Sequence, residues 1–326
     1  MLEIIFGVIA DFIVGEPENP VHPVRIIGFI ARKVEKRSRK LLKNHLKIAG
    51  GITWCIVILI TWAIGYFLIY GTYFMNYYLG FLIAGVFIYF CISAKGLKVE
   101  GFKVLEYLRN GDIEGARKRL SYIVGRDTEN LSEKEIIRAT VETVAENTVD
   151  GLISPLFYAF VGAGLTLGGV SLAAPFAMTY KAINTLDSTV GYKNEKYLHI
   201  GFASAKIDDI ANYIPSRLSV ILFTIGNFFL RNDYKDCFKI AIRDRKNHKS
   251  PNCAFSEGAV AGALGIQLGG TNVYFGETVY KPTIGDKTRE IEVEDIARTN
   301  KILYATSLTS MLVFTLFYVI ISRIFM

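Results

Sequence analysis

Side chains able to do chemistry are densest between Asn184 and Asp209. The stretch mixes amide, acidic, basic and imidazole groups, namely Asn184, Asp187, Ser188, Lys193, Asn194, Glu195, His199, Lys206, Asp208 and Asp209. Polar groups beside a bilayer are costly unless they serve a site or face water. Lys193 and Lys206 suit phosphate charge, and the adjacent Asp208 and Asp209 cannot both face one direction on a helix. We expect one wall of an active site here, with a charged loop of balanced sign as the alternative.

A second group follows a helical spacing. Arg138, Glu142 and Glu146 are four residues apart and share one face of a helix predicted from Ser132 to Asn147. Ser132 and Glu135 have the form of a capping box at its start. Two carboxylates one turn apart invite Mg²⁺, and the alternative is a solvated face with an Arg138–Glu142 ion pair. Asn147 and Asp150 continue this group towards an apolar segment, and Arg126 precedes it.

Two further groups contain the remaining candidates. His22 and Arg25 follow Gly15-Glu16-Pro17, at a turn where a first helix leaves the membrane, and suit an anionic group or a lipid headgroup equally. Arg243, His248, Asn252 and Glu257 precede a run with six glycines, Gly258–Gly276, which we expect to form a close-packed or re-entrant helix. That run is not a P-loop, because no Gly-Lys-Ser/Thr follows.

Several function classes lack their signatures. Neither a Gly-x-Ser-x-Gly elbow nor an HExxH motif occurs, which argues against the corresponding hydrolases and metalloproteases. The four cysteines form no CxxC pair, so we expect reduced structural thiols and no zinc site. Carboxylates, amides and basic groups without an obvious nucleophile fit metal-assisted phosphoryl or acyl-phosphate chemistry.

The elements that must position these groups are membrane helices. Of the 326 residues 51% are hydrophobic, and Ile48–Ala94 contains no Asp, Glu, Lys or Arg. A span needs about 20 apolar residues, so this run fits two helices with a turn at Gly71–Asn76. We predict an all-α, multi-pass membrane protein of the cell membrane with one domain. Its predicted membrane segments are 2–14, 48–70, 76–94, 152–180, 213–230 and 302–325, and its polar site segments are 95–150, 184–212 and 231–300.

The net charge of +7 comes from one segment. Residues 23–47 carry nine Lys and Arg against Glu35 alone, and Ile26, Ile27, Ile30, Val34 and Leu41 recur at near-helical spacing. This indicates a helix lying on anionic lipid at the cytoplasmic side. We expect no nucleic-acid partner, because aromatic residues are not interleaved with the charges.

The segment 152–180 allows two interpretations. It fits either one long helix or two helices broken at Gly168-Gly169. If segments 95–150 and 184–212 share one site, they need the same side of the membrane, which a broken, re-entrant pair satisfies. We therefore favour the broken form, with the polar helical loops on the cytoplasmic face and with Lys193 and Glu146 accessible from one side.

The ordered set of motifs resembles the adenosylcobinamide-phosphate synthases of cobalamin biosynthesis, of the CobD/CbiB type. The resemblance rests on Gly15-Glu16-Pro17…His22-Pro23-Val24, Gly125-Arg126-Asp127-Thr128, Val144-Ala145-Glu146-Asn147…Asp150-Gly151, Asn184-Thr185-Leu186-Asp187-Ser188, Lys206-x-Asp208-Asp209, Ser250-Pro251-Asn252 and Ala261-Gly262-Ala263-Leu264-Gly265. It spans nearly the whole chain. Two departures are Glu16, where relatives carry Asp, and Ala254-Phe255-Ser256, where relatives carry Gly-aromatic-Pro.

The resemblance implies a prokaryotic amide-forming ligase dependent on ATP and Mg²⁺. Its substrates would be adenosylcobyric acid and aminopropanol or its phosphate, with the bilayer and other enzymes of the pathway as partners. The expected catalytic residues are Glu142, Glu146, Asp150, Asp187, Asp208 and Asp209, and the expected Mg²⁺ ligands are Glu142, Glu146 and Asp209. The expected substrate and phosphate contacts are His22, Arg25, Arg126, Asn147, Asn184, Lys193, Lys206, Arg243, His248 and Asn252. The alternative is a corrinoid or anion transporter, in which polar residues line a pathway without turnover.

Overall fold

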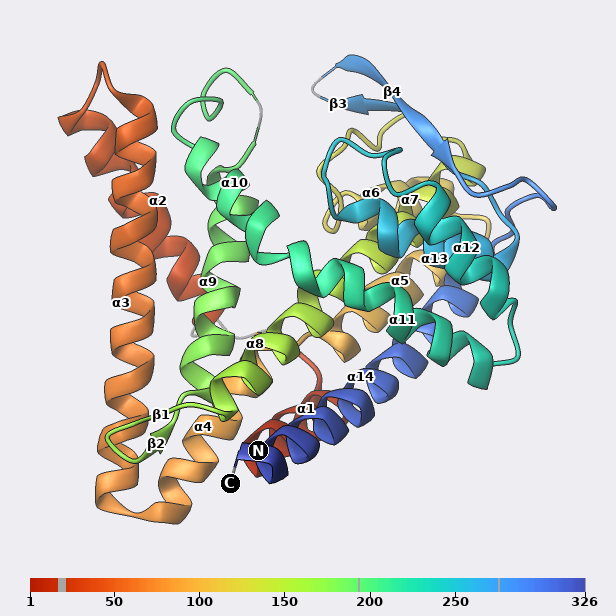
Figure 1. Ribbon diagram of the computed structural model, residues 1–326. Helices are drawn as coiled ribbons and strands as arrows, with labels where there is room; N and C mark the ends of the chain where they lie inside the picture. Colours follow the sequence, from red (N-terminus) through yellow and green to blue (C-terminus); the bar gives the residue numbers. More distant parts are fainter. Residues whose placement is uncertain (17–21, 193, 275, 326) are drawn as a thin grey trace. The chain divides into compact units, whose positions relative to one another are not determined.

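A computed structural model describes residues 1–16, 22–192, 194–274 and 276–325. The described chain is mostly helical (Figure 1). In order, the elements are α1 (Leu2–Val14), α2 (Pro23–Leu41), α3 (Leu46–Met75), α4 (Tyr77–Cys91), α5 (Ala94–Arg109), α6 (Ile113–Leu120), α7 (Glu133–Thr148), a π-helical turn (Val149–Ile153), α8 (Ser154–Ala163), β1 (Thr166–Leu167), β2 (Val170–Ser171), α9 (Ala173–Val190), α10 (Phe202–Ala211), α11 (Tyr213–Phe229), α12 (Tyr234–Arg243), α13 (Cys253–Leu264), β3 (Leu268–Tyr274), β4 (Glu277–Ile284) and α14 (Asp295–Phe325).

The contacts divide the chain into two compact units, where the sequence predicts one domain. Unit 1 comprises Met1–Ser93, Ser154–Asn212 and Val313–Met326, and unit 2 comprises Ala94–Ile153 and Tyr213–Leu312. The chain passes between the units several times, so each unit is assembled from segments that are distant in sequence. Each unit is described by itself below.

Three helices of the described chain are long and apolar enough to cross a membrane: Leu46–Met75, Tyr77–Arg109 and Asp295–Ile324. The predicted hairpin is confirmed, but its turn is shorter than predicted. Helix α3 continues to Met75, and Asn76 alone, in extended conformation, separates it from α4. The Asn76 side chain accepts the amide hydrogens of Tyr78 and Leu79, which caps α4 without a longer loop. The predicted segments 2–14, 152–180 and 213–230 form helices that are shorter or less apolar.

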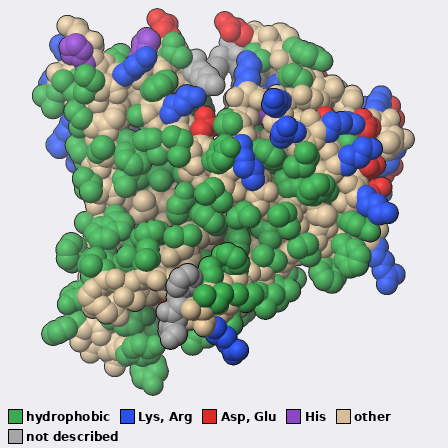
Figure 2. Space-filling model, in the orientation of Figure 1, with side chains coloured by type: hydrophobic (Ala, Val, Ile, Leu, Met, Phe, Trp, Pro, Cys, Tyr) green, Lys and Arg blue, Asp and Glu red, His purple; other side chains and the backbone are tan. Residues whose placement is uncertain are grey.

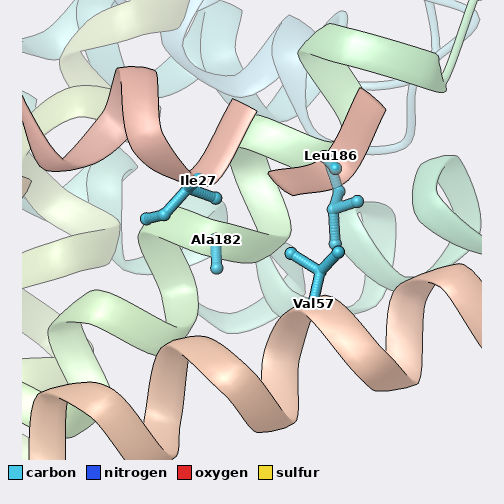
Figure 3. Packing of buried hydrophobic residues seen from close by; sticks show 5 residues of the cluster. Ile27, Val57, Ala182 and Leu186 are labelled. Carbon is cyan, nitrogen blue, oxygen red and sulfur yellow. The ribbon is translucent and has the colours of Figure 1, made fainter. Parts of the chain in front are cut away.

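In unit 1, helices α2, α3 and α9 enclose an apolar cluster. Ile27 of α2, Val57 of α3, and Ala182 and Leu186 of α9 point towards one another (Figure 3). Ile27, Ile30 and Val34 of α2 therefore contact protein, whereas Ile26 and Leu41 of the same apolar set are exposed. That α2 lies on anionic lipid stays a prediction. Other apolar side chains of α2, such as Phe29, remain exposed. Figure 2 shows hydrophobic side chains along α3, with Lys, Arg and His gathered at its N-terminal end.

The predicted break within 152–180 is present. After α8 the chain forms the two-residue strands β1 and β2, which pair antiparallel through Thr166–Ser171 and Leu167–Val170. Gly168 and Gly169 form the turn with φ of 56° and 79°, a conformation that glycine adopts without steric cost. Helices α8 and α9 then pack against each other. The crossing of a membrane by this pair, or its re-entry, stays a prediction.

Unit 2 contains a β-hairpin that the sequence analysis missed. The predicted capping box at Ser132 and Glu135 is present at the start of α7. However, Gly258–Gly276 is not a single helix: α13 ends at Gly265, which has a left-handed φ of 64°. Strands β3 and β4 then pair antiparallel with an irregularity at Leu268–Gly270. The all-α prediction is therefore corrected to a mostly helical fold with two small hairpins.

Candidate active site

In unit 1, helices α9 and α10 bring Asn184, Asp187 and Asp208 together. The Asn212 amide donates to Asp208 Oδ2 over 3.1 Å. The side-chain oxygen of Asn212, Oδ1, in turn accepts hydrogen bonds from Ser154 Oγ at 2.6 Å and from the Tyr180 hydroxyl at 2.9 Å. Because both donors hold the Asn212 amide in one orientation, its NH₂ group is fixed towards Asp208.

Asp208 differs from an ordinary aspartate in its protonation. Burial, and next the negative charge of Asp187, raise the pKa of Asp208 to about 7. The amides of Asn212 and Asn184 oppose this rise, while Asp209 adds to it. A carboxyl group that titrates near neutral pH is suited to accept or donate a proton during turnover.

Asp209 and Lys206 of the same helix form an ion pair, in which Asp209 is partly exposed. Asp209 lies 3.9 Å from Lys206 Nζ, and Lys206 is exposed. This agrees with the expectation that Asp208 and Asp209 point in different directions on a helix. Lys193 lies outside the described residues.

The N-terminal group of unit 1 lies next to the same helix. His22 is buried at the start of α2, where its Nδ1 accepts the amide hydrogen of Val24, and its ring contacts Phe90 edge-on. Burial lowers the pKa of His22; Glu16, 3.8 Å away, raises it, whereas Lys181 and Arg25 lower it further. Helix α2 packs against α9, so Lys181 of α9 lies close enough to His22 for its charge to affect the imidazole. Arg25 is exposed.

In unit 2, Glu142 is fixed by three partners. Arg126 Nη2 donates to Glu142 Oε2 at 2.6 Å, and the Gly269 amide donates to Oε1 at 2.8 Å. Arg138 Nε lies 3.8 Å from Oε1, the ion pair that the sequence analysis gave as the alternative. Arg126 also donates to Asn272 at the edge of the hairpin. Both charges are almost fully buried, so the pair joins α7 to β3 and leaves Glu142 little freedom to bind a metal.

One helical turn further along α7, Glu146 lies among reactive groups. Cys253 Sγ donates to Glu146 Oε1 at 2.9 Å. Burial and the charges of Glu142 and Glu146 raise the pKa of the neighbouring Glu257 well above its usual range. His248 Nε2 lies 3.1 Å from Lys281 Nζ. Burial and Lys281 lower the pKa of His248, although Glu146 and Glu142 raise it.

The remaining candidates of unit 2 have identifiable partners. Asn147 donates to Thr143 of its own helix, and Asp150 lies in the π-helical turn, a feature frequent at functional sites. The side-chain oxygen of Asn252, Oδ1, accepts hydrogen bonds from the Ser216 hydroxyl and the Arg217 guanidinium. Arg243 is held by Asp244 at 2.7 Å and by Asp286 at 2.8 Å, so its positive charge is already neutralised.

The four sequence groups thus form two sites. Unit 1 combines the His22 and Asn184–Asp209 groups, and unit 2 combines the Glu142–Asp150 and His248–Glu257 groups. Sequence reasoning missed Lys281 and Asn272, because both lie on the unpredicted hairpin, and Cys253, which it assigned only a structural role. That the two sites form one active centre stays a prediction.

A metal ion held by protein alone would need several grouped ligands. Among the described residues, no three His, Cys, Asp or Glu side chains are grouped closely enough to hold a metal ion. A Mg²⁺ ion bound to nucleotide phosphates needs only one or two protein carboxylates. The predicted Mg²⁺ ligands Glu142, Glu146 and Asp209 therefore stay a prediction.

Comparison with known proteins gives one consistent family. The model described as "CobD/Cbib protein" matches residues 4–303. The chain is 54% identical to the cobalamin biosynthesis protein CobD of Clostridium perfringens over 96% of each chain. It is 44% identical to the CobD protein of Clostridium tetani over 97% of each, and 44% identical to the CbiB protein of Salmonella typhi over 94% of this chain and 93% of that one. No solved structure matches.

Proposed function

Since the chain belongs to the CobD/CbiB family of cobalamin biosynthesis proteins, we propose that it is an amide-forming ligase. It joins aminopropanol, or its phosphate, to the propionate carboxylate of adenosylcobyric acid in a reaction driven by ATP with Mg²⁺. The observation that carries the proposal is Asp208, a carboxyl group beside Asp187 with a pKa of about 7.

The reaction needs an activated carboxylate. A carboxylate does not condense with an amine at neutral pH, so a propionate oxygen attacks the terminal phosphorus of ATP, forming a C–O–P bond and releasing ADP. The amine then attacks the carbonyl carbon, the C–N bond forms, and phosphate leaves with the C–O bond electrons. Positive charges that meet the transferring phosphoryl group lower the barrier.

Asp208 suits the second step. An amine loses a proton as it forms an amide, and a base with a pKa near 7 can accept that proton and release it to water. The Asn212 amide, held by Ser154 and Tyr180, fixes the carboxylate oxygen that it contacts. Lys181 of α9 and His22 of α2, whose pKa the Lys181 charge lowers, suit the anionic phosphate or carboxylate of a substrate.

Unit 2 suits the nucleotide. Burial, and next the negative charges of Glu142 and Glu146, raise the pKa of Glu257. A Mg²⁺ ion carried by ATP would offset these negative charges, with Glu146 as its carboxylate ligand, and would supply charge neutralisation for the phosphates. Lys281 supplies a positive charge beside the same carboxylates.

The direct test is mass spectrometry of a reconstituted reaction. Purified protein in lipid nanodiscs is incubated with adenosylcobyric acid, aminopropanol phosphate and Mg-ATP. The proposal predicts a corrinoid with the mass of the condensed amide and an equal amount of ADP. Unchanged corrinoid, together with ATP-independent uptake of corrinoid into proteoliposomes, would favour the transporter alternative instead.

A further inference from the structure

Unit 2 carries an open groove away from both candidate sites. It has a volume of about 630 Å³ and is lined by residues of α5, of the end of α11 and of α14. Its walls are apolar and exposed, with Phe229, Leu308 and Leu312 all more than half accessible. Two lysines, Lys98 and Lys301, lie in the same lining. An apolar wall with two positive charges indicates an amphiphilic, negatively charged occupant.

The lysines mark a membrane boundary. The uncharged run that ends at Ala94 is followed by Lys95 and Lys98, and the uncharged run that begins at Ile302 is preceded by Lys301. Lys98 Nζ lies 4.6 Å from the centre of the Tyr304 ring, so the two boundaries meet in this groove. Lysine and tyrosine at the end of an apolar span are typical of the level of lipid headgroups.

A buried acceptor lies in the same lining. Asn300 is 2% exposed, and its side-chain nitrogen donates to the Ile296 carbonyl at 2.9 Å. Its side-chain oxygen has no hydrogen-bond donor among the described residues, which is costly for a buried carbonyl. Gly101 of α5 faces Asn300 so closely that a Cβ there would collide with its amide. Asn300 is one of the residues that line the groove, although its side-chain oxygen is itself buried.

From these observations we propose that the groove binds one anionic glycerophospholipid. The lipid phosphate lies between Lys98 and Lys301, and an acyl chain follows Leu308 and Leu312 along α14. This site is separate from the proposed ligase reaction. It is a selective lipid site that would anchor unit 2 at the headgroup level.

Quenching by brominated lipid measures the site directly. The chain has two tryptophans, Trp54 and Trp62, so Trp54→Phe and Trp62→Phe with Leu312→Trp place a single indole in the groove. The protein is reconstituted in phosphatidylcholine containing increasing fractions of lipid with dibrominated acyl chains. We expect dibrominated phosphatidylglycerol to reach half-maximal quenching at a mole fraction about 25-fold below that of dibrominated phosphatidylcholine. Each lysine contributes a factor of roughly five near anionic lipid.

The lysine variants identify the cause of the preference. Lys98→Gln with Lys301→Gln should abolish it, whereas Lys98→Arg with Lys301→Arg should retain it. Lys118→Gln with Lys246→Gln, two exposed lysines of the same unit, is the matched control and should leave the preference unchanged. Equal quenching by the two lipids in the protein with native lysines would overturn the proposal, whether or not the glutamine variant folds.

Discussion

Cys253 and Glu146, 107 positions apart in the sequence, form a thiol–carboxylate hydrogen bond of 2.9 Å. The contact joins α13 to α7 and brings the glycine-rich part of the chain against the helix that carries Glu142. It explains why two motifs that are separately uninformative in the sequence belong to one site in unit 2.

The Cys253 thiol should be unreactive in the native protein. Burial, and next the charges of Glu146 and Glu257, raise its pKa well above the usual value, and the thiolate is the reactive form. Labelling by N-ethylmaleimide at about pH 7.5, near which an ordinary thiol already reacts, should show Cys253 modified only after denaturation when its peptide is analysed by mass spectrometry. Glu146→Gln should accelerate native labelling. Rapid native labelling of Cys253 at the rate of a free thiol would contradict this account.

Breaking the Arg126–Glu142 pair should destabilise the protein strongly. Glu142→Gln leaves the buried Arg126 charge without its carboxylate, which costs roughly 3–5 kcal/mol in buried pairs. The exposed Lys134–Glu290 pair, with an N–O distance of 2.9 Å, is the matched control, and Glu290→Gln should leave the free energy of unfolding nearly unchanged because water screens an exposed pair. Denaturant titration in detergent measures both. A similar decrease in the free energy of unfolding for the two variants would show that burial does not determine the contribution of the Arg126–Glu142 pair to stability.

Asp208 should make stability fall with rising pH. Its folded pKa of about 7 exceeds the ordinary value of 3.8, so between about pH 4 and 7 the folded protein holds a proton that the unfolded chain has released. This favourable contribution is complete below about pH 4 and is lost as the pH approaches about 7. Relative to Asp208→Asn, the wild type should therefore lose free energy of unfolding across that window, on the order of 4 kcal/mol.

The neighbouring carboxylate provides a check on that cause. Asp187→Asn removes a negative charge that raises the pKa of Asp208, so the same loss should end at a lower pH. The thermal midpoint measured from about pH 4 to about pH 8 compares the three proteins across the window in which Asp208 titrates. Parallel curves for wild type and Asp208→Asn would contradict the raised pKa.

Gly262 should not tolerate a side chain. A Cβ at this position would overlap the backbone carbonyl oxygen of Asp236 on α12, which a rigid helix pair cannot relieve. Gly262→Ala should therefore lower stability by about 1–3 kcal/mol. Gly51→Ala is the control, because no described atom outside the local helix lies within 4 Å of the position that a Cβ would take at Gly51. A thermal midpoint of Gly262→Ala equal to that of the control would refute close helix packing there.

Apolar pattern and caps predicted most of the helices. The uncharged run Ile48–Ala94 located α3 and α4, and Ser132 with Glu135 located the start of α7, because those signals are local. Gly168-Gly169 likewise marked the break between α8 and α9. The hairpin β3–β4 was missed because its glycines resemble those of a packed helix, and only their positive φ distinguishes them.

The site was predicted by residue type more than by role. Glu142 and Arg243 look like free functional groups in the sequence. Each is nevertheless held by a partner distant in sequence, Arg126 at 16 positions from Glu142 and Asp286 at 43 positions from Arg243. Asp208 was one of several acidic candidates, and its distinction from Asp209 depends on burial beside Asp187. These properties arise from tertiary contacts, which spacing alone does not give.

The most direct measurement follows oxygen from the corrinoid carboxylate. Adenosylcobyric acid labelled with ¹⁸O at both oxygens of its reactive carboxyl group is incubated with the protein, aminopropanol phosphate and Mg-ATP. The masses of the amide product and of the released phosphate are then measured by mass spectrometry. The account predicts one ¹⁸O in the amide product and one in the released phosphate, because the carboxylate is activated by phosphoryl transfer. Amide formed without ¹⁸O in phosphate, or no ATP-dependent amide at all, would contradict the central claim.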